Sequence, residues 1–485
     1  MKSPRFFLPA ALFCLTLTAS HSLAADAPAA ASTPTASAPA PKAEITAALP
    51  VIPDAKFNLK DFGGVGDYKT DNTEAFQKAV AAIEAAGGGH LIVPEGIYKT
   101  LPFQLTSKMD LHLNPGAVIK APETFADYGI PDPNDTPPGE RYVGGRTPPF
   151  ISGNGLTDVA ITGSGTIDGS GKIFWIWSDK FARLYPPGRA VVQRPQLISI
   201  SGVQRLHIDG VTLTNSPTFH LVPRGSDITI ENVRISTPSD APNTDAMDPG
   251  GQRIVIRNCE IDTGDDDVAV QQGSSDVLIE GLTILHGHGI SIGSGTTRGI
   301  NHMIVRDCTF DGTDNGLRIK SYRGGGGEVH DISYSNITMK NVRRPFDINM
   351  LYNGNTPTIL PNGLQSDVGP RDANDPVWSR GRGGNIPNFH DIHISNLTIT
   401  NSPIAGRMIG VAEQPPHDIT FTNVTVHADR GFLVQDGGAN ITFTNVKIEP
   451  LVGDPVVLDK ATVKLNGTDK TGPVGGSPEV FYSGN

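Results

Sequence analysis

The sequence predicts an all-β protein that folds as a parallel β-helix. A short apolar pattern recurs at intervals of one coil, and the residues at its bend are those that tolerate a left-handed backbone. The composition agrees, since the 485 residues include 55 Gly and 39 Pro and only 18% are charged. Such a chain suits many short strands joined by turns better than a bundle of helices.

The repeat is the main structural signal. Nine eight-residue segments have apolar residues at positions 1, 3, 6 and 8, and they begin at Leu206, Ile228, Ile254, Val277, Met303, Ile332, Ile392, Ile419 and Ile441. Their starts lie 22 to 29 residues apart, with one gap of 60, and this period is typical of a solenoid. The change of phase requires a bend, and position 5 is Asn in six repeats, Gly in two and Asp in one. These residues tolerate positive φ, so the stacked Asn side chains are predicted to form a ladder.

The N-terminal region predicts export. Residues 1–24 combine a basic start, an apolar run that is too short to span a bilayer comfortably, and a small-x-small cleavage site at Ser22-Leu23-Ala24. An uncleaved anchor is the alternative. Residues 25–50 are rich in Ala, Pro, Ser and Thr and predict a flexible linker, and 51–485 a single β-helix domain. We expect a secreted monomer, extracellular or periplasmic, with no membrane attachment once the signal is removed.

One helix is predicted within the mature chain. It runs from about Thr73 to Ala86, with Asp71 or Asn72 as its N-cap and three glycines after its end. The long polar stretches 129–147 and 353–388 are predicted to leave the coils as loops.

Two cysteines remain after removal of the signal, and both occupy position 6 of a repeat. Leu282 holds that position in the coil between Cys259 and Cys308. Their Cα atoms should therefore be two strand spacings, roughly 9.6 Å, apart, which is beyond the reach of a disulfide, about 7 Å. Two buried free thiols are expected.

Four polar signatures follow the apolar pattern on consecutive coils. They are Asn243-Thr244-Asp245, Gly264-Asp265-Asp266, Gly287-His288-Gly289 and Arg318-Ile319-Lys320. Neighbouring coils lie about 4.8 Å apart, so one face should carry the acids, the histidine and the cations together. Without the other three signatures, Asp265-Asp266-Asp267 would more often be a polar turn than a catalytic site.

This arrangement suits glycoside hydrolysis. One carboxyl must hold a proton for the leaving oxygen while another takes a proton from water, and close carboxyls drive their pKa values apart. His288 could hydrogen-bond the proton donor, and Arg318 and Lys320 could bind a carboxylate of the substrate. The net charge of −11 disfavours nucleic acid as a partner.

The four signatures, with Asn215-Ser216-Pro217 and Gly163 to Gly169 beside them, resemble the polygalacturonases of glycoside hydrolase family 28. The resemblance covers about Phe57 to Ile448. It implies a right-handed β-helix capped by an N-terminal helix, and inverting hydrolysis of α-1,4 bonds in pectin or polygalacturonic acid without cofactor or metal.

The resemblance also implies a role for each site residue. Asp265 would be the general acid, tuned by His288, and Asp245 and Asp266 would hold and activate water. The substrate-binding residues would be Arg318, Lys320 and Tyr352. Many fungal members have Cys where this sequence has Asp267, and Asp248 is expected to be structural.

Three alternatives stand beside an endo-acting hydrolase. The first is an exo-polygalacturonase of the same family, since loops that close one end of the cleft would give exo action. The second is a Ca²⁺-dependent pectate lyase, in which the acids would be metal ligands. The third is a non-catalytic β-helix that binds carbohydrate.

Overall fold

The structure is a computed structural model, and it describes residues 44–137, 142, 144, 147–178, 192–352, 358–359, 365–366 and 385–472. The predicted signal peptide and most of the predicted linker lie outside these residues, as do large parts of the two predicted loops. The chain divides into two units, Met1–Glu44 and Ile45–Asn485. The second unit contains the β-helix.

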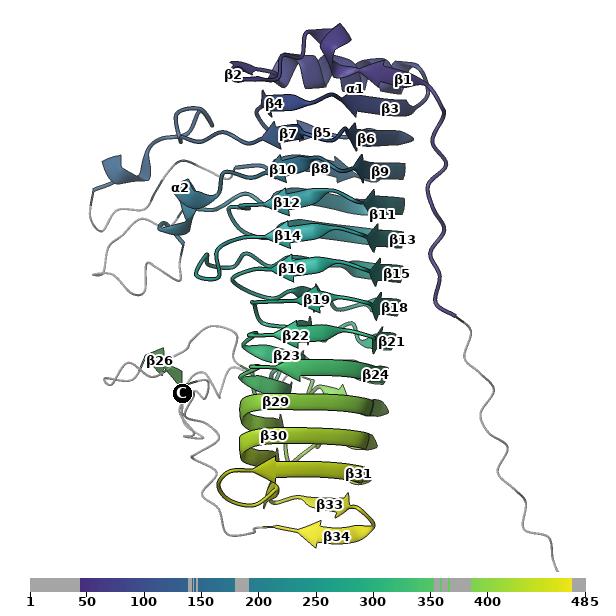
Figure 1. Cartoon of the computed structure of the whole chain (residues 1–485), viewed down its shortest axis with the longest axis vertical. Helices are drawn as coiled ribbons and strands as arrows, with labels where there is room; N and C mark the ends of the chain where they lie inside the picture. The colour runs from purple at the N-terminus through teal and green to yellow at the C-terminus, as the bar shows by residue number, and fades with distance from the viewer. Residues whose placement is uncertain are drawn as a thin grey trace, which may run out of the picture. The chain divides into compact units, whose positions relative to one another are not determined.

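The β-helix consists of three stacks of parallel strands (Figure 1). Stack A contains β1 (Lys56–Asn58), β3 (Gly89–Val93), β6 (Met109–Leu113), β9 (Thr157–Gly163), β11 (Ile198–Asp209), β13 (Leu221–Glu231), β15 (Gly250–Arg257), β18 (Ser274–Glu280), β21 (Ile300–Arg306), β24 (Glu328–Lys340), β29 (Ile392–Ile409), β30 (Ile419–Gln435), β31 (Ile441–Pro450) and β33 (Thr462–Leu465). Stack B contains β2 (Asp67–Asp71), β4 (Gly96–Lys99), β7 (Ala117–Lys120), β10 (Thr166–Asp168), β12 (Thr212–Thr214), β14 (Arg234–Ser236), β16 (Glu260–Asp262), β19 (Thr283–Ile284) and β22 (Thr309–Asp311), and continues into β24.

Stack C carries the candidate site. It contains β5 (Phe103–Gln104), β8 (Ile151–Asn154), the first residues of β11 and β13, β17 (Val268–Val270), β20 (Ile290–Ile292), β23 (Asn315–Lys320), β25 (Arg344–Asn349), the last residues of β29 and β30, and β32 (Val456–Asp459). The short β28 (Asn388–Phe389) pairs with β24. Two pairs are antiparallel: β33 with β34 (Thr468–Thr471), and β26 (Thr358–Ile359) with β27 (Gln365–Ser366).

The predicted helix is confirmed as α1 (Thr73–Ala85), which lies at the first coils of the β-helix (Figure 1). It buries Phe76, Ala79 and Ile83. Asp71 Oδ1 accepts a hydrogen bond from the Thr73 amide at 2.9 Å, so Asp71 takes up a helix-end donor. The other helices described are short: η1 (Leu59–Phe62), η2 (Pro133–Asp135) and α2 (Lys172–Trp175).

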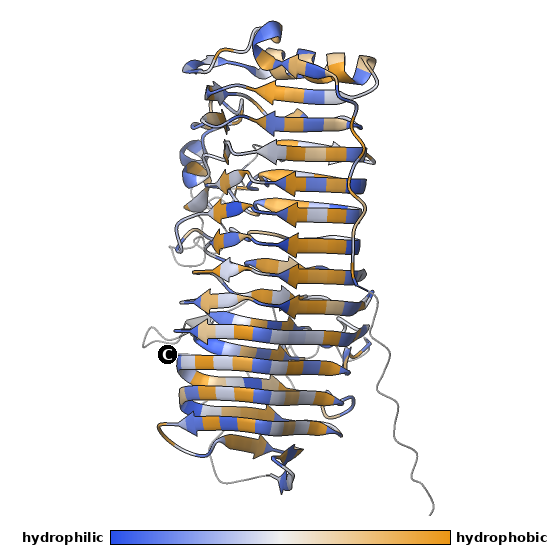
Figure 2. Cartoon of the chain, turned by 45° about the vertical axis from the view of Figure 1, so that its right-hand side comes forward, coloured by the Kyte–Doolittle hydropathy of each residue, from blue (hydrophilic) through white to orange (hydrophobic). Residues whose placement is uncertain are grey.

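The core follows the predicted pattern of inward residues. In the repeat that begins at Ile228, the side chains of Ile228, Ile230, Val233 and Ile235 are at most 1% exposed. Alternating apolar and polar bands along the strands show the same pattern (Figure 2). One cluster of buried apolar side chains runs from Leu59 to Val463. This burial supplies most of the driving force for folding.

Every position 5 has positive φ, as predicted from its residue types, and the amide ladder is present. Asn445 donates to Asn423 at 2.8 Å, Asn423 to Asn396 at 3.1 Å, and Asn396 to Asn336 at 3.2 Å. Each donor satisfies the amide oxygen on the coil before it. The ladder therefore holds neighbouring coils in register.

A second left-handed corner was not predicted. The residue directly before each repeat also has positive φ, and in three coils it is Arg205, Arg253 or His302. Arginine and histidine are not signals for this conformation. Ion pairs with the preceding coil hold two of them, since Arg205 and Arg253 each approach an aspartate to 2.6 Å.

Both cysteines are free and buried, as predicted. Burial raises the pKa of each thiol to about 12. Strand pairing places the Leu282 coil between those of Cys259 and Cys308, so these thiols pack as small apolar groups.

The chain contacts the β-helix earlier than predicted. Ile45 is 6% exposed and packs against Val255 and Leu278 on the outside of stack A. The Ala48 amide donates to Asp227 at 3.2 Å. The flexible linker expected to end at residue 50 therefore already touches the sheet at Ile45. Among the described helices, none is long and apolar enough to cross a membrane.

The ladder gives a first prediction. Asn423→Ala removes one donated and one accepted hydrogen bond and puts a Cβ-bearing aliphatic residue at φ 55°. We expect a loss of about 2–5 kcal/mol, measured by urea unfolding, because a left-handed aliphatic residue costs roughly 1–2 kcal/mol and each of the two lost hydrogen bonds costs about 0.5–1.5 kcal/mol. Asn423→Gly should lose less, since only the bonds are missing. Equal losses of stability in Asn423→Ala and Asn423→Gly would show that the left-handed backbone conformation does not contribute to the loss.

Candidate active site

The candidate site lies on stack C and on the turns that lead into it. Asp245 is two residues before Met247, which bridges Leu221 and Val268. Asp265 and Asp266 lie in the turn between β16 and β17, and His288 in the turn between β19 and β20. Arg318 and Lys320 are in β23, and Arg318 is opposite Ser291 of β20. The coil stacking thus brings the predicted residues onto one face.

Asp266 joins the acids to the cations. Its Oδ1 contacts the Arg318 guanidinium and its Oδ2 accepts from Lys320 Nζ at 2.6 Å. All three side chains are at most 8% exposed. Burial alone would raise the pKa of Asp266, but Arg318 and Lys320 outweigh it and hold the pKa below its ordinary value. Asp266 is therefore an ionised carboxylate.

Asp265 and His288 form a second contact. His288 Nδ1 lies 2.9 Å from Asp265 Oδ1, and its Nε2 lies 3.6 Å from Asp314 Oδ2. Asn243 Nδ2 donates to the other oxygen of Asp265 at 3.3 Å. The imidazole is thus held between two carboxyls. Asp314 carries no motif of its own, although it lies in the turn before β23, as Asp265 and His288 lie in the turns before β17 and β20.

Asp245 is a buried acid with little to offset the free-energy cost of its burial. It is 8% exposed, and its Oδ1 has no hydrogen-bond partner among the described residues. Burial, followed by the charges of Asp265, Asp248 and Asp266, raises its pKa well above the ordinary value. Asp245 and Asp266 therefore have opposite protonation preferences.

Two further buried carboxyls lie behind the site. Asp248 accepts from Gln271 Nε2 at 3.2 Å, and burial raises its pKa to about 7 although Arg224 opposes the shift. Asp267 is fully buried and accepts from the Gly289 amide at 2.8 Å and the Thr263 hydroxyl at 3.2 Å. Burial raises the pKa of Asp267 well above its usual range. Asp267 therefore fixes the turn that presents His288.

The glycines that flank His288 are required by space and backbone. Gly287 has φ 111°, and a Cβ there would lie 2.5 Å from Asp267 Oδ1. Gly289 has φ 74°, and a Cβ there would lie 2.2 Å from the carbonyl oxygen of Asn315. Larger residues cannot keep this turn, which explains the glycines of the signature.

Tyr352, which is predicted to bind substrate, lies beside Lys320. Lys320 Nζ is 5.3 Å from the centre of its ring, a cation–π distance. The same stack continues with a buried pair that was not predicted, in which Arg407 Nε donates to Asp347 at 2.8 Å and its NH2 group to the other oxygen at 2.9 Å. Arg344 lies nearby, and burial lowers its pKa to about 10. Cations therefore extend along stack C beyond Lys320.

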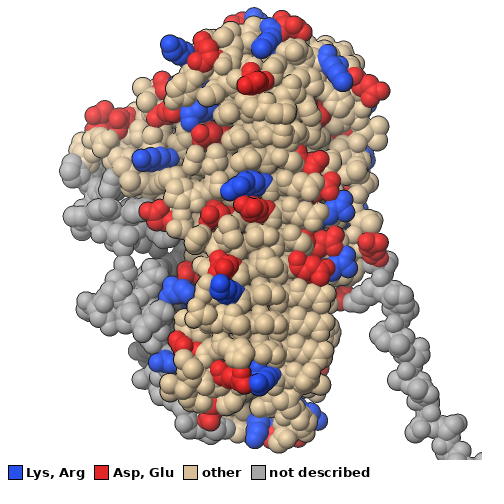
Figure 3. Space-filling model, viewed as in Figure 1, with Lys and Arg blue, Asp and Glu red and all other residues tan. Residues whose placement is uncertain are grey.

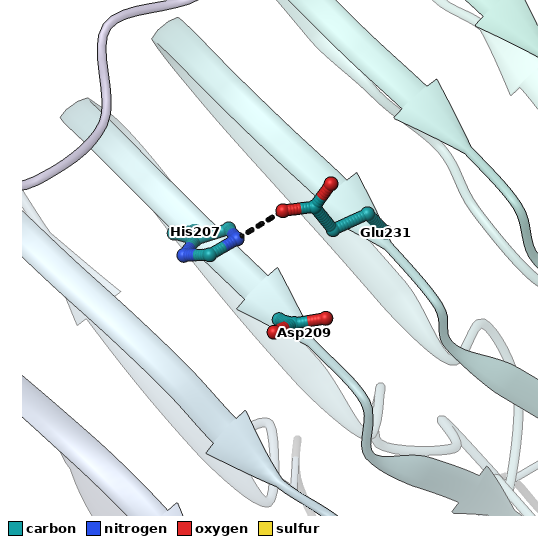
Figure 4. Close-up of side chains that lie close together, drawn as sticks. All are labelled: His207, Asp209 and Glu231. Atoms are coloured by element: carbon teal, nitrogen blue, oxygen red, sulfur yellow. Dashed lines mark hydrogen bonds and ion pairs between the residues drawn. The ribbon is translucent and has the colours of Figure 1, made fainter.

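Two groups of described residues have the composition of a metal site. One is Asp265, Asp266 and His288 themselves. The other is His207, Asp209 and Glu231 on stack A, whose side chains project from neighbouring strands (Figure 4). In the second group Glu231 is bonded to His207 and to Arg257, each at 2.7 Å. Arg257 already balances the charge of Glu231, so a metal ion is not required there.

A β-helix that lines up carboxyls, an imidazole and two cations in one row defines a carbohydrate-cleaving enzyme of the pectinase type. The profile of glycosyl hydrolases family 28 matches residues 142–369. A probable polygalacturonase of Vitis vinifera is 32% identical over 390 residues, which cover 76% of this chain and 74% of that protein. The chain belongs to glycosyl hydrolases family 28 and is a glycoside hydrolase.

Other relatives agree with this family. An endo-polygalacturonase of Pectobacterium carotovorum is 28% identical over 76% of this chain and 88% of its own length. The solved polygalacturonase of Erwinia carotovora superposes with a TM-score of 0.63 at 26% identity and covers 81% of this chain and 98% of its own. An exopolygalacturonase of Thermotoga maritima shares the fold, with a TM-score of 0.62 at 24% identity over 88% and 95% of the two chains. The predicted right-handed parallel β-helix is thereby confirmed.

Asp248 gives a second prediction. Its pKa of about 7 exceeds the unfolded value, so the folded chain holds a proton that the unfolded chain releases between about pH 4 and pH 7. Stability contributed by this group is therefore lost as pH rises through that window. Asp248→Asn should be about 2–4 kcal/mol more stable than wild type at pH 8 and nearly equal at pH 4, measured by urea unfolding. Equal stabilities at both pH values would contradict the raised pKa.

Proposed function

We propose that this enzyme is a polygalacturonase that hydrolyses α-1,4-galacturonosyl bonds of pectin with inversion. The observation that carries the proposal is the charge balance around Asp266. Two buried cations, Arg318 and Lys320, share this single carboxylate. Among the described residues these two cations share one directly contacting carboxylate, so a second carboxylate, that of a galacturonate unit, suits the pair.

The carboxyl groups of the site have different roles in the proposed hydrolysis. Asp265 donates its proton to the leaving glycosidic oxygen, and His288 at 2.9 Å orients it. Asp245 and Asp266 hold the water that attacks the opposite face of the sugar, and the ionised Asp266 accepts the proton that this water releases. An inverting enzyme keeps its acid and base far enough apart for that water. The raised pKa of Asp245 adds a second group able to carry a proton.

Endo action is the finer part of this proposal, with exo action as the alternative. The likeness to the Pectobacterium enzyme, which is named an endo-polygalacturonase, supports endo cutting. The fold is shared with an exopolygalacturonase as well, so the fold does not favour either. The loops predicted at 129–147 and 353–388 would decide between them.

A calcium-dependent lyase is disfavoured by the site. Both oxygens of Asp266 are already engaged by cations of the protein, so the central acid has little capacity left for a metal ion. We also propose, from its N-terminal sequence, that the enzyme is exported.

The third prediction concerns the products. Polygalacturonic acid digested in the presence of a chelator should give saturated oligomers of mixed length from the first time points, resolved by size and by absorbance of unsaturated ends. Monomer or dimer alone at early times would leave the hydrolysis intact and make the enzyme exo-acting. Unsaturated ends, or activity that returns only with calcium, would refute the hydrolase mechanism.

The fourth prediction separates the general acid, Asp265, from Asp245, a residue that holds the attacking water. Asp265→Asn should lose about 10²- to 10⁴-fold in kcat on polygalacturonic acid. It should lose far less on an oligogalacturonide with a nitrophenol leaving group, because that oxygen needs no proton. Asp245→Asn should be slow on both substrates.

Asp262→Asn is the matched control, because Asp262 lies three residues earlier and bonds His286 at 2.7 Å instead of the site. It should retain near wild-type activity. The reverse outcome, in which the activated substrate restores Asp245→Asn alone, would make Asp245 the general acid.

A further inference from the structure

The described surface includes a groove of about 610 Å³ beside the site. We call it the N-terminal groove and define it by Lys120, Asp168, Lys172, Trp175, Asn215 and Asp240, which are part of its lining. It lies between the short helix α2 and the turns that follow β7, β10, β12 and β14. Figure 1 shows α2 beside the ends of these stack B strands.

The groove is in line with the catalytic acids. Asp265 follows β16, and strand pairing links Asp262 to Ser236, Ser236 to Thr214, and Thr214 to Asp168. Three coil spacings of about 4.8 Å put the Asp168 turn roughly 14 Å from the Asp265 turn. Ala241, which lines the groove, packs so closely on Gly264 that a Cβ there would lie 2.2 Å from its carbonyl oxygen. A chain bound across the acids therefore continues into this groove.

The groove has an apolar and aromatic side. Trp175 is half-buried, and its indole Nε1 donates to the carbonyl oxygen of Ser216 at 3.0 Å, which fixes the ring. Ile173 and Ile176 line the groove beside it, and Ile176 is 47% exposed. Fixed aromatic and aliphatic side chains are typical of sites that bind the apolar parts of a ligand.

The described residues that line the groove offer no surplus of positive charge. Its lining has two lysines and three carboxylates, those of Glu123, Asp168 and Asp240. Lys120 Nζ is held by Asp168 at 2.7 Å, and Asp240 is exposed. Basic and acidic side chains are also interspersed on the face seen in Figure 3. The arrangement at Arg318 and Lys320 differs, because there two buried cations share one directly contacting carboxylate.

From this contrast we propose that the N-terminal groove binds uncharged galacturonosyl units whose carboxyl group is methyl-esterified. The proposal rests on the proposed function, since it extends the same cleft. An ionised unit would find no surplus positive charge among the described residues there, because Lys99 lies 3.5 Å from Glu123 and three lysines thus balance the three carboxylates. An esterified unit brings no charge and adds a methyl group against Trp175 and the two isoleucines. The enzyme thus cuts at a free galacturonate beside Arg318 and Lys320 and accepts esterified units on the groove side only.

The test uses the full-length enzyme on polygalacturonic acid and on randomly methyl-esterified pectin of matched chain length. Wild type should cleave both, and mass spectrometry should find esterified units on one side only of the new chain ends. Asp240→Lys should shift the ratio of kcat/KM roughly fivefold toward polygalacturonic acid, because it changes the groove charge by two units near the substrate. Trp175→Ala should lose more activity on the esterified substrate than on polygalacturonic acid.

Asp454→Lys is the matched control, because it makes the same change in net charge on an exposed turn after β31. Its substrate ratio should equal that of wild type. The proposal is overturned if Asp240→Lys and Asp454→Lys behave alike, or if esterified units are excluded from both sides of the cut. Failure of wild type to cleave polygalacturonic acid would overturn the proposed function itself, and is thus distinguishable from failure of the groove proposal alone.

Discussion

The hydrogen-bonded spacing between parallel coils is the constraint on which this structure depends. Each coil must return to the same height and phase before the next can pair with it, and left-handed corners at fixed positions achieve this. As a consequence, residues that are one coil apart in sequence lie about 4.8 Å apart in space. Asp266 can therefore touch both Arg318 and Lys320, more than fifty residues later.

The site makes use of buried charge that a purely structural core would avoid. Asp266 is stabilised as an anion by its two cations, whereas Asp245 and Asp267 are buried with raised pKa values. Buried carboxyls of this kind reduce stability when they ionise. The long apolar interior of the solenoid compensates for this cost, so the polar row is tolerated on one face. Different protonation states of adjacent acids are what acid–base catalysis requires.

Much of this organisation could be predicted from the sequence, because the coil period and the corner residues are local signals. The free state of Cys259 followed from the same period. Other features depend on partners that no local pattern identifies. Arg205 adopts a left-handed corner because an aspartate of the preceding coil holds it. Ile45 lies in an Ala- and Pro-rich stretch whose composition alone does not show which residue packs on the sheet. The contact between His288 and Asp314 likewise required the register between coils.

The position of the site along the stack has a further consequence. It is built from consecutive central coils, whereas α1 and the β33–β34 hairpin lie at the two ends. A solenoid is quasi-one-dimensional, so its terminal units have a neighbour on one side only and open first, while central units are supported from both sides. The end coils are therefore expected to unfold before the central coils do. Heating can unfold the coils at the two ends of the β-helix while the residues from Asp245 to Lys320 keep the geometry that catalysis requires.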